Sequence, residues 1–502
     1  MKNVLEYLER SAQSRPDKPA FNDEAAGVRL TFAEMLRLCR STGSALAEHV
    51  SPGEPVAVFM DKGTKALTAF WGAVYAGGFY CMFSPELPAP RLQAMYSVLS
   101  PACVVTDSEH ENSARTLFPD AEVRLIEALS SSSCNSGLLL DIRARAIDTD
   151  ALYVNFTSGS TGLPKGVVVS HRSVIDFIEV FTGLFGITDD DIIGNQAPFD
   201  FDVSVKDMYS ALMVGATLDI IPKNLFSRPS ELVEHLYRHK VTTLIWAVSA
   251  ICLISSLHGL DYRTPDSIKR VLFSGEVMPK KHLDAWRRSL PRAMFVNLYG
   301  PTEITCNCTY HILHPDKGYE DGIPIGIPFP NEDVFLLSEN EERITSPSCI
   351  GEICVRGSAL ALGYYRDSAS TDAVFTQNPL NARYPERIYR TGDLGYYSEG
   401  GELYFSGRQD FQIKHMGHRI ELGEIERAAE SLDGVSRCCC LYDMERSRIC
   451  AYYTGSLPPR ELRGLLRAAL PAYMVPSNAI HIDAFPLGKN GKIDRKRLLE
   501  GG

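Results

Sequence analysis

The sequence predicts an α/β fold with a large amino-terminal domain and a small carboxy-terminal one. The chain has 502 residues, more than a single hydrophobic core usually organises. From about residue 50 to residue 300, apolar segments typical of strands alternate with helical patterns, an alternation that favours largely parallel sheets. The alternating segments are Pro55–Met60, Lys65–Val74, Gly78–Met82, Ala102–Thr106, Thr217–Ile221, Thr243–Ala247 and Arg270–Ser274.

The character of the sequence changes after about residue 320. Shorter strands between glycine turns, such as Gly351–Gly357 and Gly401–Gly407, predict a β-rich subdomain. From Phe411 onward, strand patterns mixed with amphipathic helices at Glu421–Leu432 and Pro459–Leu470 predict a small mobile lid domain. The serine run at 130–133, followed by Asn135-Ser136-Gly137, is interpreted as a surface loop.

Composition and charge exclude several classes of protein. Apolar residues make up 45% of the chain, and no apolar run approaches the roughly 18 residues needed to cross a bilayer, so we expect no membrane partner. A net charge of −11 gives no broad footprint for nucleic acid. The first ten residues lack the apolar block of a secretory signal, and the 13 cysteines form no Cys-x-x-Cys pair. Reduced thiols and a cytoplasmic location are therefore expected.

The ten residues Thr157–Gly166 have the composition of a phosphate-binding loop. They include small hydroxyl residues, three glycines and one lysine, and they lie between two segments that are interpreted as strands. Glycines let backbone N–H groups approach phosphate oxygens, hydroxyls add donors, and lysine neutralises charge. The spacing differs from the phosphate loop of kinases and GTPases, which begins a helix. Taken alone, the segment is also compatible with a flexible surface loop.

Five further segments combine glycine, charge and aromatic residues. Asn297–Glu303 ends a strand in a tight turn, and Glu303 is a candidate Mg²⁺ ligand because a carboxylate beside phosphates needs a cation between them. Asp393 follows a predicted strand and offers two acceptor oxygens to vicinal ribose hydroxyls. Asp202 lies in an apolar setting and requires a cationic partner. The remaining two are Gly407–Asp410, at the predicted domain boundary, and Asn490–Arg495, which places Lys492 on a tight turn.

Together these segments resemble the adenylate-forming enzymes, and within them the amino-acid adenylation domains of nonribosomal peptide synthesis and the stand-alone D-alanine:carrier-protein ligases. The resemblance runs nearly end to end, with the family's motifs in order. They are Thr157–Gly166, Phe201–Ser204, Tyr299–Glu303, Gly351–Tyr365, Tyr389–Leu394, Gly407–Glu426, Leu470–Pro476 and Asn490–Arg495. The resemblance implies a core at 1–409, with two parallel-rich sheets and the β-rich subdomain, and a lid at 410–502.

The resemblance also implies ATP and Mg²⁺ as cofactors. The triphosphate would be held by Thr157, Ser158, Gly159, Ser160, Thr161, Gly162 and Lys165; the base region by Ser274, Gly275, Glu276, Asn297, Tyr299, Gly300 and Thr302; and ribose by Asp393 and Arg408. Glu303 would ligate magnesium. Lys492 would bridge the substrate carboxylate and the α-phosphate and stabilise the charge that develops during attack. Thr157, Lys165, Glu303 and Lys492 would form the catalytic set.

By the same resemblance, Asp410 is a hinge about which the lid rotates between two half-reactions. In the first, the amino-acid carboxylate attacks the α-phosphorus and releases pyrophosphate. In the second, a phosphopantetheine thiol accepts the acyl group, and the Gln412–Gly417 segment faces the thiol. The sequence stops shortly after Arg495 with no carrier module, so the carrier protein is expected to act in trans.

The resemblance places the selectivity positions at Asp202, Val203, Lys206, Ser249, Leu272, Ser274, Leu298, Cys306, Asn307 and Lys492. Asp202 and Lys492 define an α-amino acid, and the mid-sized apolar and small polar residues between them imply a small side chain such as that of alanine, serine or cysteine. Lys206 departs from the neutral residue usual there. It either extends outward along its apolar stem or faces the pocket and selects an acidic side chain. Ser274 replaces the cysteine usual in D-alanine ligases and argues against D-alanine.

Simpler interpretations accompany these roles. Asp202 is also compatible with an exposed helix cap, Glu303 with a first-turn carboxylate favoured by the helix dipole, and Lys492 and Asp410 with ordinary surface positions. Cys306 and Cys308 suit a core or pocket lining better than a metal site, because two further ligands are lacking. Three consecutive cysteines, 438–440, suit alternating positions of a strand. The rival activity is that of an acyl-CoA or aryl-acid CoA ligase, which has no use for Asp202.

Overall fold

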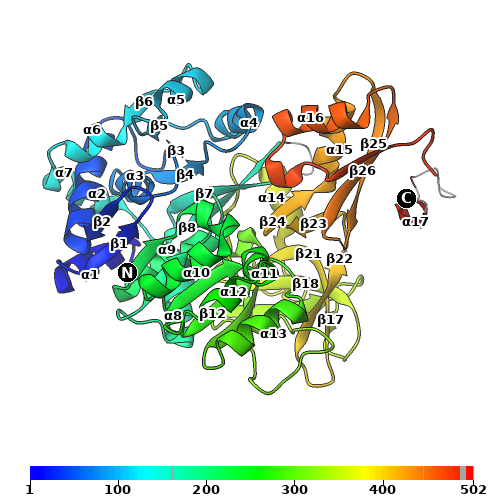
Figure 1. Ribbon diagram of the computed structural model, residues 1–502. Coiled ribbons are helices and arrows are strands. Elements are labelled where there is room, and N and C mark those ends of the chain that lie inside the picture. The colour runs from blue at the N-terminus through cyan, green and yellow to red at the C-terminus, as the bar shows by residue number, and fades with distance from the viewer. Residues whose placement is uncertain (160–162, 445, 487–492, 494, 501–502) are drawn as a thin grey trace. The chain divides into compact units, whose positions relative to one another are not determined.

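The structure is a computed structural model that describes residues 1–502 except 160–162, 445, 487–492, 494 and 501–502 (Figure 1). The chain divides into two compact units. The first consists of Met1–Pro85, Leu99–Asn155 and Gly166–Gln409, and the second of Glu86–Val98, Phe156–Lys165 and Asp410–Gly502. The predicted phosphate loop therefore groups with the carboxy-terminal residues in the second unit. The role of residues 410–502 as a lid with its hinge at Asp410 stays a prediction.

The first unit contains a nine-stranded sheet. Its order is β15 (Ile327–Pro328), β14 (Thr309–Ile312), β13 (Met294–Tyr299), β12 (Arg270–Ser274), β11 (Thr243–Ala247), β9 (Ile192–Asn195), β10 (Thr217–Ile220), β1 (Pro19–Asp23) and β2 (Val28–Thr31). The strands from β13 to β1 pair in parallel, whereas β2, β14 and β15 join as antiparallel strands at the two edges. Because β11, β12 and β13 run parallel, their carboxyl ends meet at one edge of the sheet, where open α/β sheets bind ligands.

A second sheet, of seven strands, has the order β19 (Gly363–Tyr364), β8 (Lys165–Ser170), β7 (Ala151–Thr157), β4 (Phe79–Phe83), β3 (Pro55–Phe59), β5 (Cys103–Thr106) and β6 (Val123–Leu125). Strands β7 to β6 pair in parallel. The predicted phosphate loop joins β7 to β8, so the expectation of a loop between two strands is confirmed. Two largely parallel sheets are present, as predicted.

The β-rich part of the first unit is an antiparallel sheet. Its order is β17 (Arg343–Ile344), β16 (Glu332–Leu337), β18 (Gly351–Gly357), β21 (Arg387–Tyr397) and β20 (Phe375–Gln377), with β22 (Leu403–Arg408) also paired to β21. One expectation here is wrong. Asp393 does not follow a strand but lies inside β21, opposite Arg408 of β22, because the strand continues through Gly392, which adopts a φ of +70°.

Helices cover and connect these sheets. Those of the first unit are α1 (Leu5–Ser14), α2 (Phe32–Leu46), α3 (Thr64–Tyr75), α5 (Glu111–Leu117), α6 (Ile126–Ser131), α7 (Ser136–Arg145), α8 (His171–Phe185), α9 (Val203–Val214), α10 (Pro229–Arg238), α11 (Val248–Ser256), α12 (Gly259–Tyr262), α13 (Lys280–Ser289) and α14 (Ser368–Val374). The 3₁₀ turns are η1 (Lys223–Ser227) and η2 (Thr302–Ile304). None of the helices in the described part of the chain is long and apolar enough to span a bilayer.

The serine-rich segment is not the continuous loop that was predicted. Its first serines end α6, and Ser136 begins α7. The Asn135 side chain accepts a hydrogen bond from the backbone N–H of Leu138 and so caps α7, which is why a segment rich in Ser, Asn and Gly starts a helix here.

The second unit contains α4 (Ala89–Leu99), the hairpin β23 (Gln412–His415) and β24 (His418–Glu421), α15 (Leu422–Glu430), α16 (Pro459–Ala469), η3 (Ala472–Met474), α17 (Arg495–Glu500), and the sheet β25 (Val435–Asp443), β26 (Arg448–Gly455) and β27 (Asn478–His481). The three consecutive cysteines lie in β25, as predicted. Cys438 and Cys440 join one hydrophobic cluster and Cys439 joins another, because successive side chains of a strand point to opposite faces.

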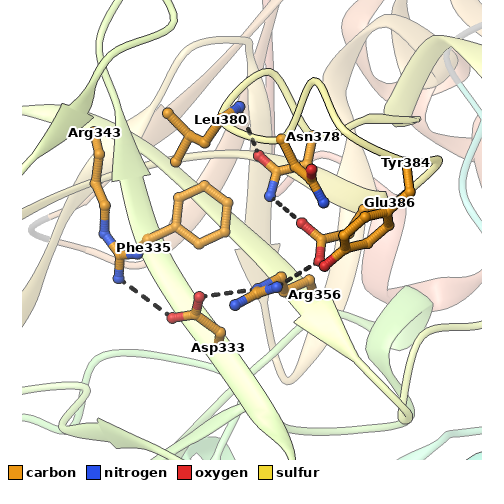
Figure 2. Close-up of a pocket in the computed structure, with 9 residues that line it drawn as sticks. Asp333, Phe335, Arg343, Arg356, Asn378, Leu380, Tyr384 and Glu386 are labelled. Carbon is orange, nitrogen blue, oxygen red and sulfur yellow. Dashed lines mark hydrogen bonds and ion pairs between the residues drawn. The ribbon is translucent and has the colours of Figure 1, made fainter.

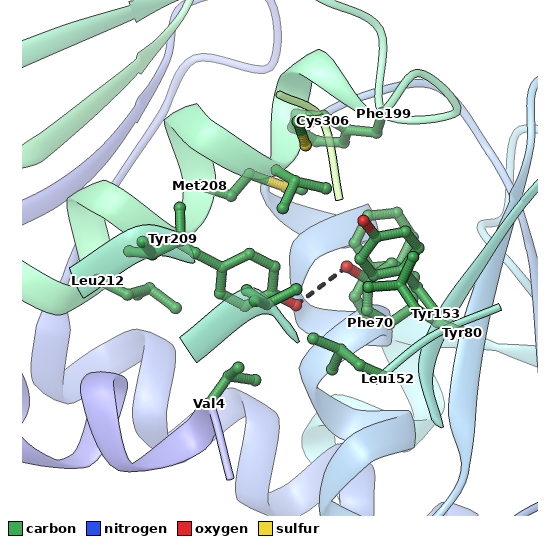
Figure 3. Close-up of a cluster of buried hydrophobic side chains, with 14 of the residues drawn as sticks. Val4, Phe70, Tyr80, Leu152, Tyr153, Phe199, Met208, Tyr209, Leu212 and Cys306 are labelled. Atoms are coloured by element: carbon green, nitrogen blue, oxygen red, sulfur yellow. Dashed lines mark hydrogen bonds between the residues drawn. The ribbon is translucent and has the colours of Figure 1, made fainter. Parts of the chain in front are cut away.

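A buried aromatic cluster supports the helix that begins at the predicted substrate aspartate. Tyr209, on α9, and Tyr80, on β4, join their hydroxyls at 2.9 Å, and Tyr80 stacks on Phe70 with ring centroids 4.2 Å apart (Figure 3). Cys306 packs in the same cluster. Offset aromatic pairs and buried hydroxyl partners favour one fixed arrangement. The cluster therefore fixes the position of α9 within the first unit.

Candidate functional site

Most of the predicted base and substrate residues follow the carboxyl ends of three parallel strands. Ser274 ends β12 opposite Ala247 of β11, while Phe273 of β12 lies opposite Asn297 of β13. Ser249 begins α11 directly after β11. The predicted residues on these strands and the turns after them are Leu272, Ser274, Gly275, Glu276, Asn297, Leu298, Tyr299, Gly300, Thr302 and Glu303. The fold thus gathers at one sheet edge residues that span more than fifty positions of sequence.

Asp202 occupies the N-cap position of α9 but does not cap it. Its side chain makes no capping hydrogen bond with the helix, and the residue is buried, with 8% of its surface exposed. The interpretation of Asp202 as an exposed helix cap is therefore wrong. A carboxylate taken out of water without a capping role needs a positively charged partner. The next residue, Val203, is also buried.

Lys206 lies one turn further along α9 and is fully buried, with 0% of its surface exposed. Its Nζ donates a hydrogen bond to Oδ1 of Asn307 at 2.6 Å. The interpretation in which Lys206 extends outward to solvent is wrong, since no part of it reaches the surface. Burial lowers the pKa of the ammonium, and the nearby Cys306, Asp202 and Asp207 oppose that shift. Two predicted selectivity residues, Lys206 and Asn307, are thus in direct contact.

The turn that carries Cys306 and Asn307 has a strained backbone. Thr305 and Cys306 have φ values of +52° and +78°, in the left-handed region that side chains with a Cβ rarely adopt. The Thr305 hydroxyl donates to the Ala359 carbonyl at 2.7 Å, and the Cys306 thiol donates to the Asp202 carbonyl at 3.0 Å. A Cβ at Gly300 would lie 2.5 Å from Cα of Asn307, so this turn requires glycine at 300. The same turn carries Asn307, which contacts Lys206.

The predicted adenine and ribose residues form a hydrogen-bonded group in the first unit. The Tyr299 hydroxyl donates to Oδ2 of Asp393 at 2.5 Å, and the guanidinium of Arg408 pairs with Oδ1 of the same carboxylate. Burial, together with the Asp393 charge, holds the pKa of Tyr299 far above its ordinary value, so the phenol keeps its proton. Asn297 does not direct its amide N–H to this group. It donates instead to the Pro324 carbonyl at 2.9 Å.

Glu303, the candidate magnesium ligand, is fully buried in the turn η2. The hydroxyl of Tyr364, in β19, donates to Oε1 of Glu303 at 2.7 Å, and the Ala361 N–H donates to its backbone carbonyl at 2.8 Å. A carboxylate held in this way has a fixed orientation, which is what a hard divalent cation needs from an oxygen ligand. The interpretation of Glu303 as a helix-dipole carboxylate does not account for its complete burial.

The described part of the phosphate loop belongs to the second unit. The Gly159 N–H donates to Oε2 of Glu424 at 3.3 Å, and the Ser158 hydroxyl donates to the Arg419 carbonyl at 3.0 Å. Arg91 pairs with Oε1 of Glu424 at 2.6 Å. The Glu424 carboxylate therefore accepts a hydrogen bond from a backbone N–H of the kind that binds phosphate oxygens. Burial raises the pKa of Glu424, opposed chiefly by Arg91.

Of the remaining predicted site residues in the second unit, the structure describes only some. The Thr157 hydroxyl donates to the Lys165 carbonyl at 3.4 Å, closing the loop at its base. Asp410 is exposed and accepts a hydrogen bond from the Gln412 N–H at 3.1 Å. Ser160, Thr161, Gly162 and Lys492 lie outside the described residues.

Several residues that the structure places at the site were not singled out in the sequence. Tyr364 orients Glu303, and Glu424 contacts the phosphate loop. Asp207, next to Lys206 on α9, is fully buried and accepts from Nδ2 of Asn195 at 2.7 Å. Burial raises the pKa of the Asp207 carboxyl to about 7, opposed by Asn195 and two lysines. The sequence signal was an acidic residue directly after Lys206 in a largely apolar helix.

A separate polar pocket lies in the β-rich part of the first unit, lined by residues of β16, β17 and β18 and of the segment between β20 and β21 (Figure 2). Its charges are already paired. Asp333 accepts from Arg356 at 3.0 Å and from Arg343 at 3.4 Å, while Glu386 accepts from Arg356 at 2.5 Å and from Asn378 at 2.6 Å. A pocket whose charges neutralise one another stabilises the subdomain and is a poor candidate for a ligand site.

The chain belongs to the family of AMP-binding enzymes, whose sequence model matches residues 8–365. It is 31% identical over 505 residues to bacitracin synthase 1 of Bacillus licheniformis, covering 99% of this chain but only 9% of that protein. It is 30% identical to an L-proline--[L-prolyl-carrier protein] ligase of Streptomyces coelicolor, over 98% of this chain and 94% of the relative. Among solved structures, IdnL1 matches with a TM-score of 0.84 and 26% identity, over 97% of this chain and 99% of that one. The predicted family and fold class are confirmed.

Proposed function

We propose that this protein activates an amino acid with ATP, releases pyrophosphate, and transfers the aminoacyl group to the phosphopantetheine thiol of a carrier protein. Membership of the AMP-binding enzymes and similarity to a carrier-protein ligase over nearly the whole chain support this activity. The observation that carries it is Asp202. This buried carboxylate at the start of α9 makes no capping bond with the helix, and its negative charge suits the α-ammonium group of an amino acid.

The nucleotide roles follow from the hydrogen-bonded group of Tyr299, Asp393 and Arg408. Asp393 offers acceptor oxygens to the ribose hydroxyls, Arg408 pairs with the same carboxylate, and the Tyr299 ring offers a face to adenine. Glu303 has the oxygen donors that Mg²⁺ prefers, and Tyr364 fixes their direction. When bound, Mg²⁺ neutralises charge on the phosphates. Thr157, Lys165 and Lys492 keep their proposed catalytic roles.

The buried ammonium of Lys206 indicates the substrate class. Its Nζ donates a hydrogen bond to the neutral amide oxygen of Asn307, and the nearby Cys306, Asp202 and Asp207 act on its charge. A buried ammonium is costly unless an anion pairs with it. A carboxylate on the substrate side chain would pair with this ammonium, and we propose an acidic amino acid, aspartate or glutamate, on that ground. A small neutral amino acid, such as alanine, serine or cysteine, is the alternative, and in that case Lys206 would be neutral in the complex.

The rival activity, transfer to coenzyme A by an acyl or aryl-acid CoA ligase, shares the adenylation step. Such an enzyme has no ammonium on its substrate, and Asp202 then has no function. The carrier protein is proposed to act in trans, and a cytoplasmic location, with no nucleic acid and no membrane partner, remains our expectation.

The test is amino-acid-dependent ATP–pyrophosphate exchange over a panel of L- and D-amino acids and simple carboxylic acids. We expect exchange with aspartate or glutamate, and loss of that preference in Lys206→Met. Preference for an acid without an α-amino group would contradict amino-acid activation. Exchange with aspartate or glutamate that is unaffected by Lys206→Met would refute the acidic pocket alone. Transfer of the product to a phosphopantetheinylated carrier, compared with free coenzyme A, separates the two second steps.

A further inference from the structure

A second cluster of ionisable residues lies where strands β1 and β10 of the nine-stranded sheet meet the end of α10. None of its residues has a proposed role in adenylation. It contains Glu24, Asp219, His235 and His239. Strands β1 and β10 run parallel, with Asn22 opposite Asp219, so Glu24 follows β1 close to Asp219. The two histidines are four residues apart at the carboxyl end of α10, and their rings stack with centroids 3.9 Å apart. Side chains with that spacing share one face of a helix.

Asp219 fixes the tautomer of both histidine rings. Nε2 of His235 donates to Oδ2 of Asp219, and Nδ1 of His239 donates to Oδ1, both at 2.7 Å. The Asp219 carboxylate is almost fully enclosed. An ionised carboxylate only accepts hydrogen bonds, so these two nitrogens carry protons. The other nitrogen of each ring is therefore available to bind a cation.

Those other nitrogens converge on one oxygen of Glu24. Nδ1 of His235 lies 2.9 Å and Nε2 of His239 lies 3.1 Å from Oε2 of Glu24. Despite this proximity, Nδ1 of His235 has no hydrogen-bond partner among the described residues, and its ring is almost completely buried. Three ligand atoms within 4.8 Å of one another, including an orphaned buried nitrogen, form the kind of donor set that surrounds a metal ion.

We propose that Glu24, His235 and His239 bind a divalent transition-metal ion, with zinc as the preferred ion and Asp219 as the partner that orients both imidazoles. Two imidazole nitrogens and one carboxylate oxygen are a typical zinc donor set, and a water completes the tetrahedron. Ligands about 2.0 Å from zinc lie about 3.3 Å apart in such a tetrahedron, close to the separations found. A carboxylate that accepts from metal-bound histidines is the usual second partner of such sites.

The surroundings of the cluster agree with a cation site. Arg238 Nη2 lies 2.7 Å from Oε1 and 2.9 Å from Oε2 of Glu24, so it can remain on Oε1 when Oε2 binds the ion. The Glu24 side chain is 42% exposed, which leaves the ion a route from solvent. The bound ion would tie the β1–β2 hairpin to α10 and leave the adenylation residues unchanged.

The test uses the full-length protein without a histidine tag, stripped with a chelator and then titrated with Zn²⁺. We expect one tightly bound zinc per chain by elemental analysis, a rise in the thermal unfolding midpoint, and absorption bands of a four-coordinate ion when Co²⁺ replaces zinc. Glu24→Gln and His239→Gln should each weaken zinc binding at least tenfold. The matched control is His258→Gln, which changes an exposed histidine 3.0 Å from Asp261 and should bind zinc as the unaltered protein does.

The outcomes separate the proposal from its alternatives. Circular dichroism establishes that each variant is folded, and Glu24→Gln is the informative one because its side chain is partly exposed. Zinc binding and thermal shift that are equal in Glu24→Gln, His239→Gln and the unaltered protein would overturn the proposal. The absence of stoichiometric zinc would also overturn the proposal. Hydrogen bonds from the two rings to the Asp219 and Glu24 carboxylates would then account for the arrangement of the cluster.

Discussion

Nζ of Lys206 lies 2.6 Å from Oδ1 of Asn307, and both residues are buried inside the first unit. The contact joins α9 to the strained turn after β13. It makes the two residues energetically dependent on each other, because each satisfies a buried polar group of the other.

The first prediction is a double-mutant cycle on this pair. Asn307→Leu leaves the ammonium buried without an acceptor and should cost about 3 kcal/mol in the free energy of unfolding. Adding Lys206→Met removes the charge as well and should restore more than half of that loss, since replacing both partners with apolar groups is nearly neutral. Urea unfolding without substrate measures all three variants. Additive losses in the double variant would show that the two side chains do not interact.

The second prediction concerns pH. The Asp207 carboxyl has its pKa raised to about 7 in the folded state, from an ordinary value of 3.8. The folded protein therefore binds the extra proton between those values, and its stability falls as pH rises through this window, by up to about 1.4 kcal/mol per unit. Asp207→Asn cannot titrate.

Unfolding of Asp207→Asn and of the unaltered protein should be compared at pH 5 and pH 8. We expect the stability difference to move in favour of the variant at pH 8. A difference that is the same at both values would mean that Asp207 is ionised throughout the range.

The third prediction tests the nucleotide group. Asp393→Asn removes the charged acceptor proposed for the ribose and should raise KM for ATP about tenfold or more, because hydrogen bonds to charged groups contribute about 1.5–3 kcal/mol. Tyr299→Phe keeps the ring and loses only the hydroxyl that donates to Asp393, so its effect should be smaller. Exchange with 2′-deoxy-ATP supplies the control. If removal of the 2′-hydroxyl is equally harmful in Asp393→Asn and in the unaltered protein, Asp393 does not contact the ribose.

The fourth prediction concerns the orientation of Glu303. Tyr364→Phe removes the hydroxyl that donates to Oε1 of Glu303 and should raise the Mg²⁺ concentration needed for half-maximal exchange several-fold, with a smaller effect on kcat. Tyr365→Phe is the matched control, since its neighbouring ring makes no contact with Glu303 that the structure records. Equal magnesium dependence in Tyr364→Phe and Tyr365→Phe would exclude Tyr364 as a positioning residue.

The sheets and most helices follow from the sequence because apolar periodicity reports burial directly. The structure has strands with the predicted bounds at Thr243–Ala247, Arg270–Ser274 and Gly351–Gly357. The failures have local causes. Asn135 begins a helix where the composition favoured a loop, and Asp393 lies inside a strand that Gly392 allows to continue.

The site was less predictable, since its contacts join residues far apart in the sequence. The motifs drew attention to Asp202, Glu303 and Asp393, but nothing local indicated that Tyr364 contacts Glu303 or that Lys206 reaches Asn307. Whether a lysine on a helix points to solvent or to the core depends on which face the fold covers. In α9 both faces are covered, and the outward interpretation of Lys206 failed for that reason.

The most direct test of amino-acid activation is ATP–pyrophosphate exchange by Asp202→Asn with the preferred amino acid and with its deaminated analogue. The unaltered protein should exchange with the amino acid alone, and Asp202→Asn should lose at least a hundredfold in kcat/KM for it, equivalent to about 2.7 kcal/mol, because the ammonium loses its charged partner. Exchange by Asp202→Asn at the unaltered rate with the amino acid would contradict the account.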